Sequence, residues 1–108
     1  MKKWIVLVLV VALCLPALVV FAENPAAGKS GEDLFKEHCT MCHPDGGNII
    51  NPRKTLNKKD LAANNIASEA DIVRIMRNPG PGMTNFDEKA IPDKDAAEIA
   101  KYILKTFK

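Results

Sequence analysis

The sequence predicts an all-α domain of short helices joined by loops. Three observations support this prediction. Apolar residues recur at three- and four-residue steps, helix-capping signals precede those segments, and no stretch shows convincing alternation with a two-residue period. With 108 residues, the chain is short enough for one domain.

The first 22 residues predict a secretory signal peptide. Two lysines follow Met1, and the stretch from Trp4 to Ala22 is apolar and uncharged. Val20 and Ala22, which stand at the two positions that matter for cleavage, are small or modest in size, so we expect cleavage after Ala22. Cleavage implies export, and we expect the protein to work in the bacterial periplasm.

Two alternatives to cleavage stay open at this stage. The apolar stretch approaches the roughly 20 residues that a helix needs to span a bilayer, so it could be kept as a membrane anchor. Cys14 could instead carry a lipid, although Leu13 is larger than the residue that a lipoprotein signal has before its cysteine. Only these two alternatives predict contact with a membrane.

The charge of the chain gives no reason to expect a nucleic-acid partner. The formal net charge is +2, and Lys2 and Lys3 account for it, so residues 23–108 are formally neutral. No run of Lys and Arg in that part exceeds two residues.

The small size of the domain predicts a bound group in its core. A domain of this size buries only about 60% of its unfolded surface, or slightly more, and usually needs a disulfide, a metal or a cofactor. Cys39 and Cys42 are the only cysteines after residue 22, which is too few for a disulfide framework. A cofactor is therefore expected to supply the missing apolar volume.

The first half of the exported chain contains a leader and two predicted helices. Residues 23–30 are small and polar and include Pro and Gly, which is typical of a flexible leader, and the folded domain is expected over residues 31–108. A helix is predicted over residues 31–39, with Ser30 as N-cap and two acids in its first turn. A turn-forming loop follows, and Asn57 can cap a second helix over about 58–64.

The second half contains two more predicted helices. Ser68-Glu69-Ala70-Asp71 resembles a capping box, and Ile72, Ile75 and Met76 form one apolar face of the helix that follows. Pro79-Gly80-Pro81-Gly82 ends that helix. Pro92 suits the first turn of the last helix, whose apolar stripe contains Ala96, Ala100, Ile103, Leu104 and Phe107.

The chemistry is expected at Cys39-Thr40-Met41-Cys42-His43, a Cys-x-x-Cys-His sequence that signals covalent attachment of haem c. Both thiols add to vinyl groups of one porphyrin, so they must lie about one helical turn apart. His43 then falls beneath the iron and supplies its proximal imidazole. Covalent attachment suits an exported protein, since the haem cannot diffuse away.

Three other interpretations of these cysteines are weaker. A thiol–disulfide redox site expects a βαβ context, which a helical chain lacks. A structural zinc site needs four ligands, and His38 stands directly beside Cys39, where it closes a tetrahedron poorly. A chance occurrence of the short motif is the third interpretation.

Met83 is the strongest candidate for the second axial ligand of the iron. His38 and Met41 lie too close to the attachment site to reach the other face of the ring, and Met76 fits an apolar stripe. Met83 follows a rigid proline-rich loop that can bring its thioether over the haem. Ligation by His and Met raises the reduction potential relative to two histidines, and a filled coordination sphere favours electron transfer.

From about Ser30 to Phe107 the sequence resembles the class I cytochromes c, and more narrowly the small cytochrome c-six type. Gly31 and Phe35 match the family's N-terminal helix, and Tyr102 matches the aromatic at which the C-terminal helix crosses it. Other matching segments are Gly46-Gly47-Asn48-Ile49-Ile50 and Lys54-Thr55-Leu56 below the haem, and Gly82-Met83-Thr84-Asn85-Phe86 around the axial methionine. Thr84 stands where the family usually has proline.

The resemblance implies a monomeric electron-transfer protein, not an enzyme, with one haem c and its iron. It would exchange single electrons with other redox proteins by transient docking, and its place could be respiratory or linked to extracellular acceptors. Pro44 would orient His43 through a backbone carbonyl. Supporting roles fall to Phe35, Leu56, Phe86 and Tyr102. The alternative is a haem-based sensor of small ligands, or a peroxidase-like enzyme, in which the methionine ligand is labile.

Overall fold

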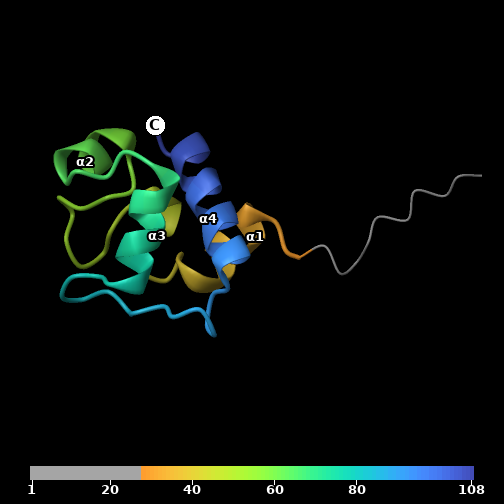
Figure 1. Cartoon of the computed structure of the whole chain (residues 1–108). Helices are drawn as coiled ribbons and strands as arrows, with labels where there is room; N and C mark the ends of the chain where they lie inside the picture. Colours follow the sequence, from red (N-terminus) through yellow and green to blue (C-terminus); the bar gives the residue numbers. More distant parts are fainter. Residues whose placement is uncertain (1–27) are drawn as a thin grey trace, which may run out of the picture.

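The computed structural model describes residues 28–108, which fold into helices and loops (Figure 1). In chain order the elements are α1 (Gly31–His38), a short 3-10 helix η1 (Pro44–Gly46), α2 (Lys58–Ala63), α3 (Glu69–Arg77) and α4 (Asp93–Thr106). No strand occurs in this described part of the chain, so the prediction of an all-α domain is confirmed. The predicted signal peptide and residues 23–27 of the predicted leader lie outside the described residues.

Two helices begin at the caps that the sequence predicts. Ser30 Oγ accepts a hydrogen bond from the backbone N–H of Asp33 at 3.1 Å and so caps α1. Ser68 and Asp71 form the predicted reciprocal capping box at the start of α3. Each cap satisfies backbone donors that a helix N-terminus otherwise leaves without partners.

The prediction for the second helix is only partly right. Asn57 stands at the N-cap position of α2, but its side chain makes no capping hydrogen bond. The polar contact near this helix start instead joins the Thr55 hydroxyl to the Asp60 carboxylate. None of the helices between residues 28 and 108 is long and apolar enough to cross a membrane.

Helix α1 crosses α4 so closely that only glycine fits at one position. A β-carbon at Gly31 would lie 2.3 Å from the carbonyl oxygen of Glu98 and 3.0 Å from Cβ of Tyr102. The rings of Phe35 and Tyr102 pack at this crossing with centroids 5.3 Å apart, and the ring of Phe107 lies 5.3 Å from that of Phe35. These residues, which we name the helix crossing, confirm the arrangement that the resemblance predicts.

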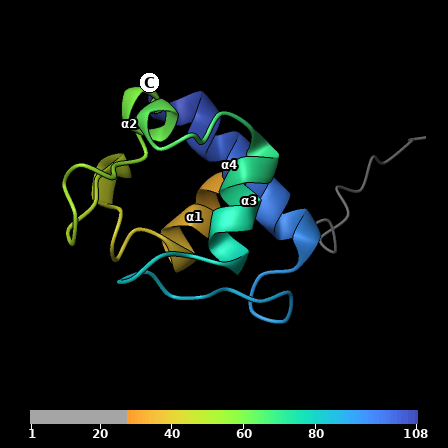
Figure 2. The same ribbon diagram turned by 60° about the vertical axis from the view of Figure 1, so that its left-hand side comes forward.

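Helix α3 packs on α4 beside the helix crossing (Figures 1 and 2). The buried core is made of Leu34, Phe35, Leu61, Ile72, Met76, Ile91, Ala96, Ile99, Ala100 and Ile103. The loops 47–57 and 78–92 extend beyond the packed helices in both views. One part of the domain is therefore a helical core, and the other is built largely from loops.

Candidate haem site

A cavity of about 360 Å³ lies where the long loops meet the helices. Its volume is in the range of about 300–1,000 Å³ that is usual for ligand sites. Lys54 is the only Lys, Arg, Asp or Glu residue on its wall. The aliphatic side chains on the wall are those of Ile50, Leu56, Leu61, Ile66, Ile72, Ile75, Ile91 and Ile103. Such a wall suits a large apolar ligand with few polar groups, as haem is.

Cys39 and Cys42 both line this cavity from a tight turn that continues α1. The backbone N–H groups of Cys42 and His43 donate to the carbonyl oxygen of Cys39 at 3.2 and 2.9 Å. The turn thus keeps two cysteines and the following histidine on the wall of one cavity. A porphyrin that binds both cysteines and the histidine fits this arrangement.

The surroundings of Cys39 argue against the alternative sites. Burial raises the pKa of the Cys39 thiol to about 11, whereas redox-active cysteines have a lowered pKa because the thiolate is the nucleophile. Among residues 28–108, no three His, Cys, Asp or Glu side chains are placed to hold a metal ion together. The structure therefore gives no support to a thiol–disulfide site or a zinc site at these cysteines.

His43 is oriented by a hydrogen bond to the backbone. Its Nδ1 donates to the carbonyl oxygen of Gly47 at 2.7 Å, since a carbonyl can only accept. With the proton on Nδ1, the Nε2 atom has the lone pair that a metal ligand needs. The prediction that the Pro44 carbonyl orients His43 is therefore wrong, because the Gly47 carbonyl does so. The Pro44 carbonyl accepts the backbone N–H of Gly47 at 2.9 Å and closes the same turn.

The turn after His43 is tied to the helix crossing through Gly46. Gly46 has a φ of +78°, and a β-carbon there would lie 2.4 Å from the ring of Phe107. The backbone N–H of Leu56 donates to the carbonyl of Gly46 at 2.7 Å. The aromatic cluster that joins α1 to α4 therefore also holds the turn that orients His43.

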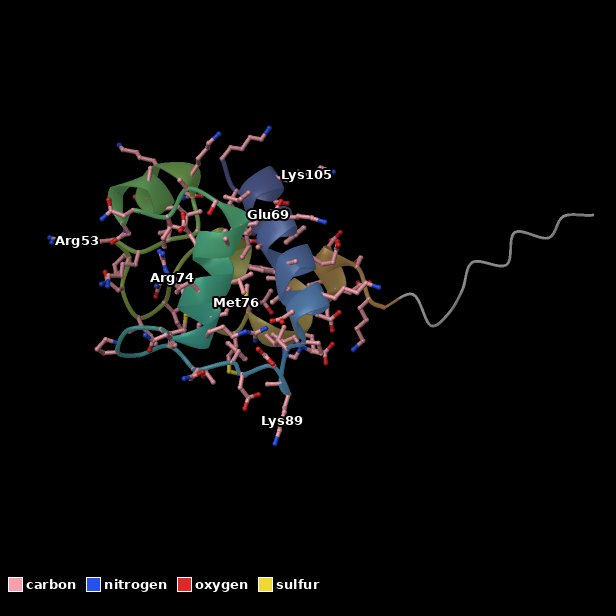
Figure 3. All side chains as sticks on the ribbon, viewed as in Figure 1. Arg53, Glu69, Arg74, Met76, Lys89 and Lys105 are labelled. Atoms are coloured by element: carbon pink, nitrogen blue, oxygen red, sulfur yellow. The ribbon has the colours of Figure 1, made fainter. Side chains whose placement is uncertain are left out.

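Three methionines line the cavity, and they differ in their surroundings. Met41 is 87% exposed, and Met76 is only 4% exposed on α3, where Figure 3 labels it. Met83 is half-buried in the loop between α3 and α4, after Gly82 with its φ of +93°. A loop residue can present its thioether to an iron without breaking the packing of a helix, so Met83 stays the best candidate ligand.

The predicted supporting residues fall into two groups. Leu56 and Phe86 line the cavity, in agreement with a role beside the haem. Phe35 and Tyr102 do not line it, and they belong to the helix crossing. Their influence on the haem site is therefore indirect, through Phe107 and the turn after His43.

Two polar residues that shape the loops were missed by sequence reasoning. Asn48 Oδ1 accepts the backbone N–H groups of Ile50 and Asn51 at 2.9 and 2.8 Å, and its Nδ2 donates to the carbonyl of Lys54 at 2.9 Å. The Gly-Gly-Asn sequence is a turn signal that could have identified Asn48. Arg77 carried no such signal, because the groups it contacts lie nine or more residues further along the chain.

Known proteins share both the sequence and the arrangement of these elements. The family model described as "Cytochrome C oxidase, cbb3-type, subunit III" matches residues 26–103. A cytochrome c6 from Cyanidium caldarium is 36% identical, over 96% of this chain and 94% of that protein. The chain belongs to the class I cytochromes c. The predicted haem c, its iron and the electron-transfer role without enzyme activity are thereby confirmed.

Solved structures place this cytochrome among the small members of the family. OmcF, the outer membrane cytochrome F from Geobacter sulfurreducens, is 44% identical, with a TM-score of 0.71 over 73% of this chain and 100% of that chain. Cytochrome c6C from a Synechococcus species is 26% identical, with a TM-score of 0.66 over 71% of this chain and 93% of that chain. The class I fold predicted from the resemblance is confirmed.

Proposed function

We propose that this cytochrome carries single electrons between redox proteins outside the cytoplasm, with Cys39 and Cys42 holding the haem and His43 and Met83 ligating the iron. The observation that supports this assignment is that all four side chains line one largely apolar cavity. Haem c, when bound, supplies the one-electron chemistry through the ferric and ferrous states of its iron. The protein supplies the position and surroundings of that group.

His43 is the proximal ligand in this proposal. The hydrogen bond from its Nδ1 to the Gly47 carbonyl fixes both the tautomer and the ring orientation, and it makes Nε2 more basic. The turn that contains Gly47 is held in place by Phe107 against Gly46. The imidazole therefore keeps its orientation when the charge at the site changes by one electron.

The apolar wall and Met83 favour electron transfer over other haem chemistry. With two protein ligands no coordination position is left open for oxygen or peroxide. His38 also lines the cavity, but its ring packs edge-on against Phe86 with centroids 6.1 Å apart. His43 and Met83 fill both axial positions, so His38 has no ligand role in this proposal.

The proposed compartment is the periplasm, which the protein reaches by export with a signal peptide that is cleaved after Ala22. We further propose a place in bacterial respiration, including one linked to extracellular acceptors. The similarity to OmcF, whose name describes an outer membrane cytochrome of Geobacter sulfurreducens, supports work outside the cytoplasm. We propose docking of a monomer to partners through a small, transient interface, below about 1,200 Å² in total. Arg53, Lys54, Lys58 and Lys59 are exposed, and we include them in this docking surface. Figure 3 shows Arg53 pointing away from the domain.

The test is a visible spectrum of protein produced together with haem-maturation machinery. We expect sharp c-type bands on reduction, and in the ferric protein the weak red band of a methionine–iron bond. Met83→Leu should abolish the red band and keep the covalent haem. Met76→Leu is the matched control, since it removes the buried cavity methionine on α3 and should leave the band in place.

Other outcomes would assign the protein differently. A red band that survives Met83→Leu and disappears in Met76→Leu would transfer the ligand role to α3. A haem protein without the band that binds carbon monoxide rapidly when reduced would be a sensor or peroxidase-like protein. Absence of covalent haem would contradict the assignment of Cys39 and Cys42.

A further inference from the structure

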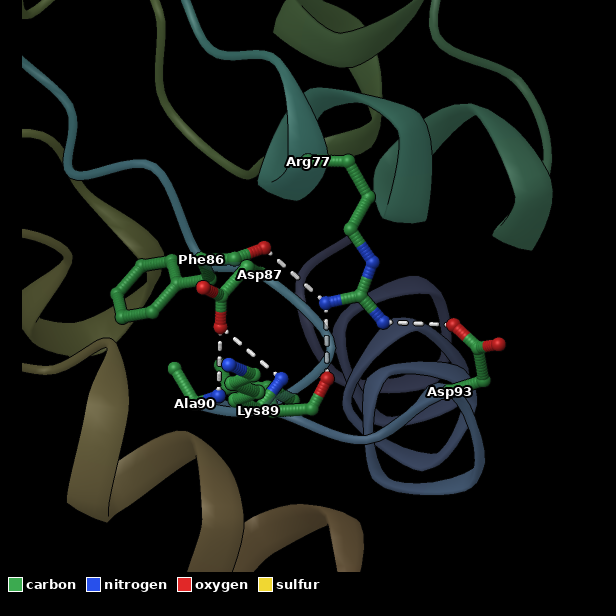
Figure 4. Close-up of polar contacts among 7 residues, drawn as sticks. Arg77, Phe86, Asp87, Lys89, Ala90 and Asp93 are labelled. Atoms are coloured by element: carbon green, nitrogen blue, oxygen red, sulfur yellow. Dashed lines mark hydrogen bonds and ion pairs between the residues drawn. The ribbon is translucent and has the colours of Figure 1, made fainter.

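Arg77 makes three hydrogen bonds that no part of the proposed function has used (Figure 4). Its Nη1 donates to the carbonyl oxygens of Phe86 and Ile91 at 3.1 and 2.8 Å, and its Nη2 donates to Asp93 Oδ1 at 2.7 Å. The Arg77 side chain is 21% exposed, whereas that of Asp93 is 76% exposed. The two carbonyl contacts are thus the more sheltered ones, and charge-assisted bonds of this kind are stronger than neutral ones.

These contacts close the base of the loop that contains Met83. The backbone N–H of Phe86 donates to the carbonyl of Met76 at 2.9 Å, and Arg77 Nη1 donates to the carbonyl oxygen of the same Phe86. The chain therefore leaves α3 after Arg77 and comes back to the end of that helix at Phe86. Three residues span at most about 10 Å, so a fixed Phe86 limits where Met83 can lie.

The segment on the far side of Phe86 is a preformed turn. Asp87 Oδ1 accepts the backbone N–H groups of Lys89 and Ala90 at 3.0 and 2.8 Å (Figure 4). The Asp87 carbonyl oxygen accepts the backbone N–H of Ile91 at 3.0 Å. Arg77 binds the carbonyls directly before and after this turn. One side chain therefore connects the end of α3, the loop of Met83 and the start of α4.

We propose that Arg77 is the positioning residue for Met83: by fixing the Phe86 and Ile91 carbonyls it holds the loop closed over the cavity and keeps the thioether within reach of the iron. The inference rests on the proposed function, in which Met83 is the axial ligand. Arg77 does not line the cavity and touches the haem site only through the backbone of this loop. Without its donors the loop opens more often, and the sixth coordination position is exposed more often.

The test uses the haem-loaded protein with Arg77→Met, which keeps most of the aliphatic stem and removes the donors. We expect ferrous protein to bind carbon monoxide at least about tenfold faster, since the loss of even one of the three charge-assisted hydrogen bonds shifts an opening equilibrium by about that factor. The ferric methionine band should also disappear at a lower pH than in wild type. Hydrogen exchange of the Phe86 amide should accelerate, which is a readout independent of the haem.

Two controls separate positioning from general stability. Arg74→Met removes a guanidinium from the same helix, where it is 64% exposed and, among residues 28–108, pairs only with Asp71. It should change none of these readouts. Ser68→Ala removes the N-cap at the other end of α3 and should lower Tm without a change in carbon monoxide binding. If Arg77→Met lowers Tm like Ser68→Ala but leaves carbon monoxide binding and the band unchanged, Arg77 is only structural.

The remaining outcomes also decide the matter. If wild-type protein has no methionine band, the proposed ligand is wrong and the inference fails with it. If wild-type protein has the band, and Arg77→Met loses it at the same pH as wild type and binds carbon monoxide at the same rate, only the inference fails. Should Arg77→Met yield no folded protein, Arg77→Lys provides the test, because it keeps the charge but lacks the fork that reaches two carbonyls at once. It must then show the same changes to a smaller degree.

Discussion

The helix crossing and the haem cavity are two parts of one small core that are completed by different means. At the crossing, Phe35 is only 2% exposed, and Gly31 lets two backbones meet. At the cavity, Ile50 lies on the wall of a space of about 360 Å³ and is 58% exposed. The protein alone fills the first part, whereas the second needs the haem to complete its packing.

The two parts are nevertheless joined at specific residues. Phe107 packs on Phe35 in the crossing, and its ring also lies against Gly46 in the turn after His43. On the other side, α3 buries Ile72 and Met76 while both residues line the cavity. The crossing is therefore a support for the haem site, and variants at either part can show how strongly one depends on the other.

The largest effect is expected from loss of the haem attachment in the double variant Cys39→Ser, Cys42→Ser. Leaving a cavity of about 360 Å³ unfilled costs several kcal/mol, a large share of the roughly 5–15 kcal/mol that stabilises a domain. We expect loss of covalent haem and of cooperative thermal unfolding, measured by absorption and far-ultraviolet circular dichroism. Cooperative unfolding with native helicity in this variant would show that the crossing is sufficient on its own.

The next largest effect is expected from Gly31→Ala, which disturbs the helix crossing and changes no residue of the cavity wall. In Gly31→Ala the new β-carbon meets the Glu98 carbonyl at 2.3 Å, so the helices must separate, and we expect a loss of about 3 kcal/mol in the free energy of unfolding. Glu32→Ala, at the next position of α1, is the matched control, because this exposed side chain lies away from the cavity wall and makes a surface ion pair with Lys36, which contributes little to stability. Denaturant unfolding of the haem-loaded variants measures both. Equal stability of the two variants would contradict the close crossing.

The parts of the fold and site that depend on local signals could be predicted from the sequence, whereas those that depend on backbone geometry could not. The helices were predictable because caps and apolar steps are local signals, as at Ser30, Ser68 and Asp71. The cysteine spacing and His43 were predictable because the attachment chemistry fixes their separation. The orienting carbonyl was assigned to Pro44 and belongs to Gly47, because a turn's hydrogen bonds depend on its φ and ψ angles, which sequence letters do not specify.

Long-range polar contacts were beyond the sequence for a related reason. Arg77 looks like any basic residue in the last turn of a helix, where it would be expected to face solvent. Only the fold brings Phe86, Ile91 and Asp93 to its guanidinium. A local pattern predicts the ends of α3, and tertiary structure decides what its last residue binds.

The smallest effect concerns the start of α3, the helix that belongs to both parts. The backbone N–H of Ala67, together with the side chain and backbone N–H of Ser68, holds the pKa of Asp71 below its ordinary value of 3.8. A lowered pKa in the folded state means that this carboxylate stabilises the fold above pH 3.8, and that its contribution is lost as the pH falls through the folded-state pKa. Asp71→Asn should therefore lower Tm at pH 7, and the difference from wild type should vanish in strong acid.

A variant without a titrating group shows whether this pH dependence belongs to Asp71. Asn64 Nδ2 donates to the carbonyl of Asp60 at 2.8 Å at the end of α2, and Asn64→Ala removes that uncharged donor. Its difference in Tm from wild type should stay nearly constant with pH, since no proton is bound or released by the lost group. Thermal melts of the haem-loaded proteins at pH 7 and in strong acid, well below pH 3.8, make the comparison. If the Asp71→Asn difference persists in acid as the Asn64→Ala difference does, the capping box stabilises α3 by geometry alone, and the charge of Asp71 contributes nothing.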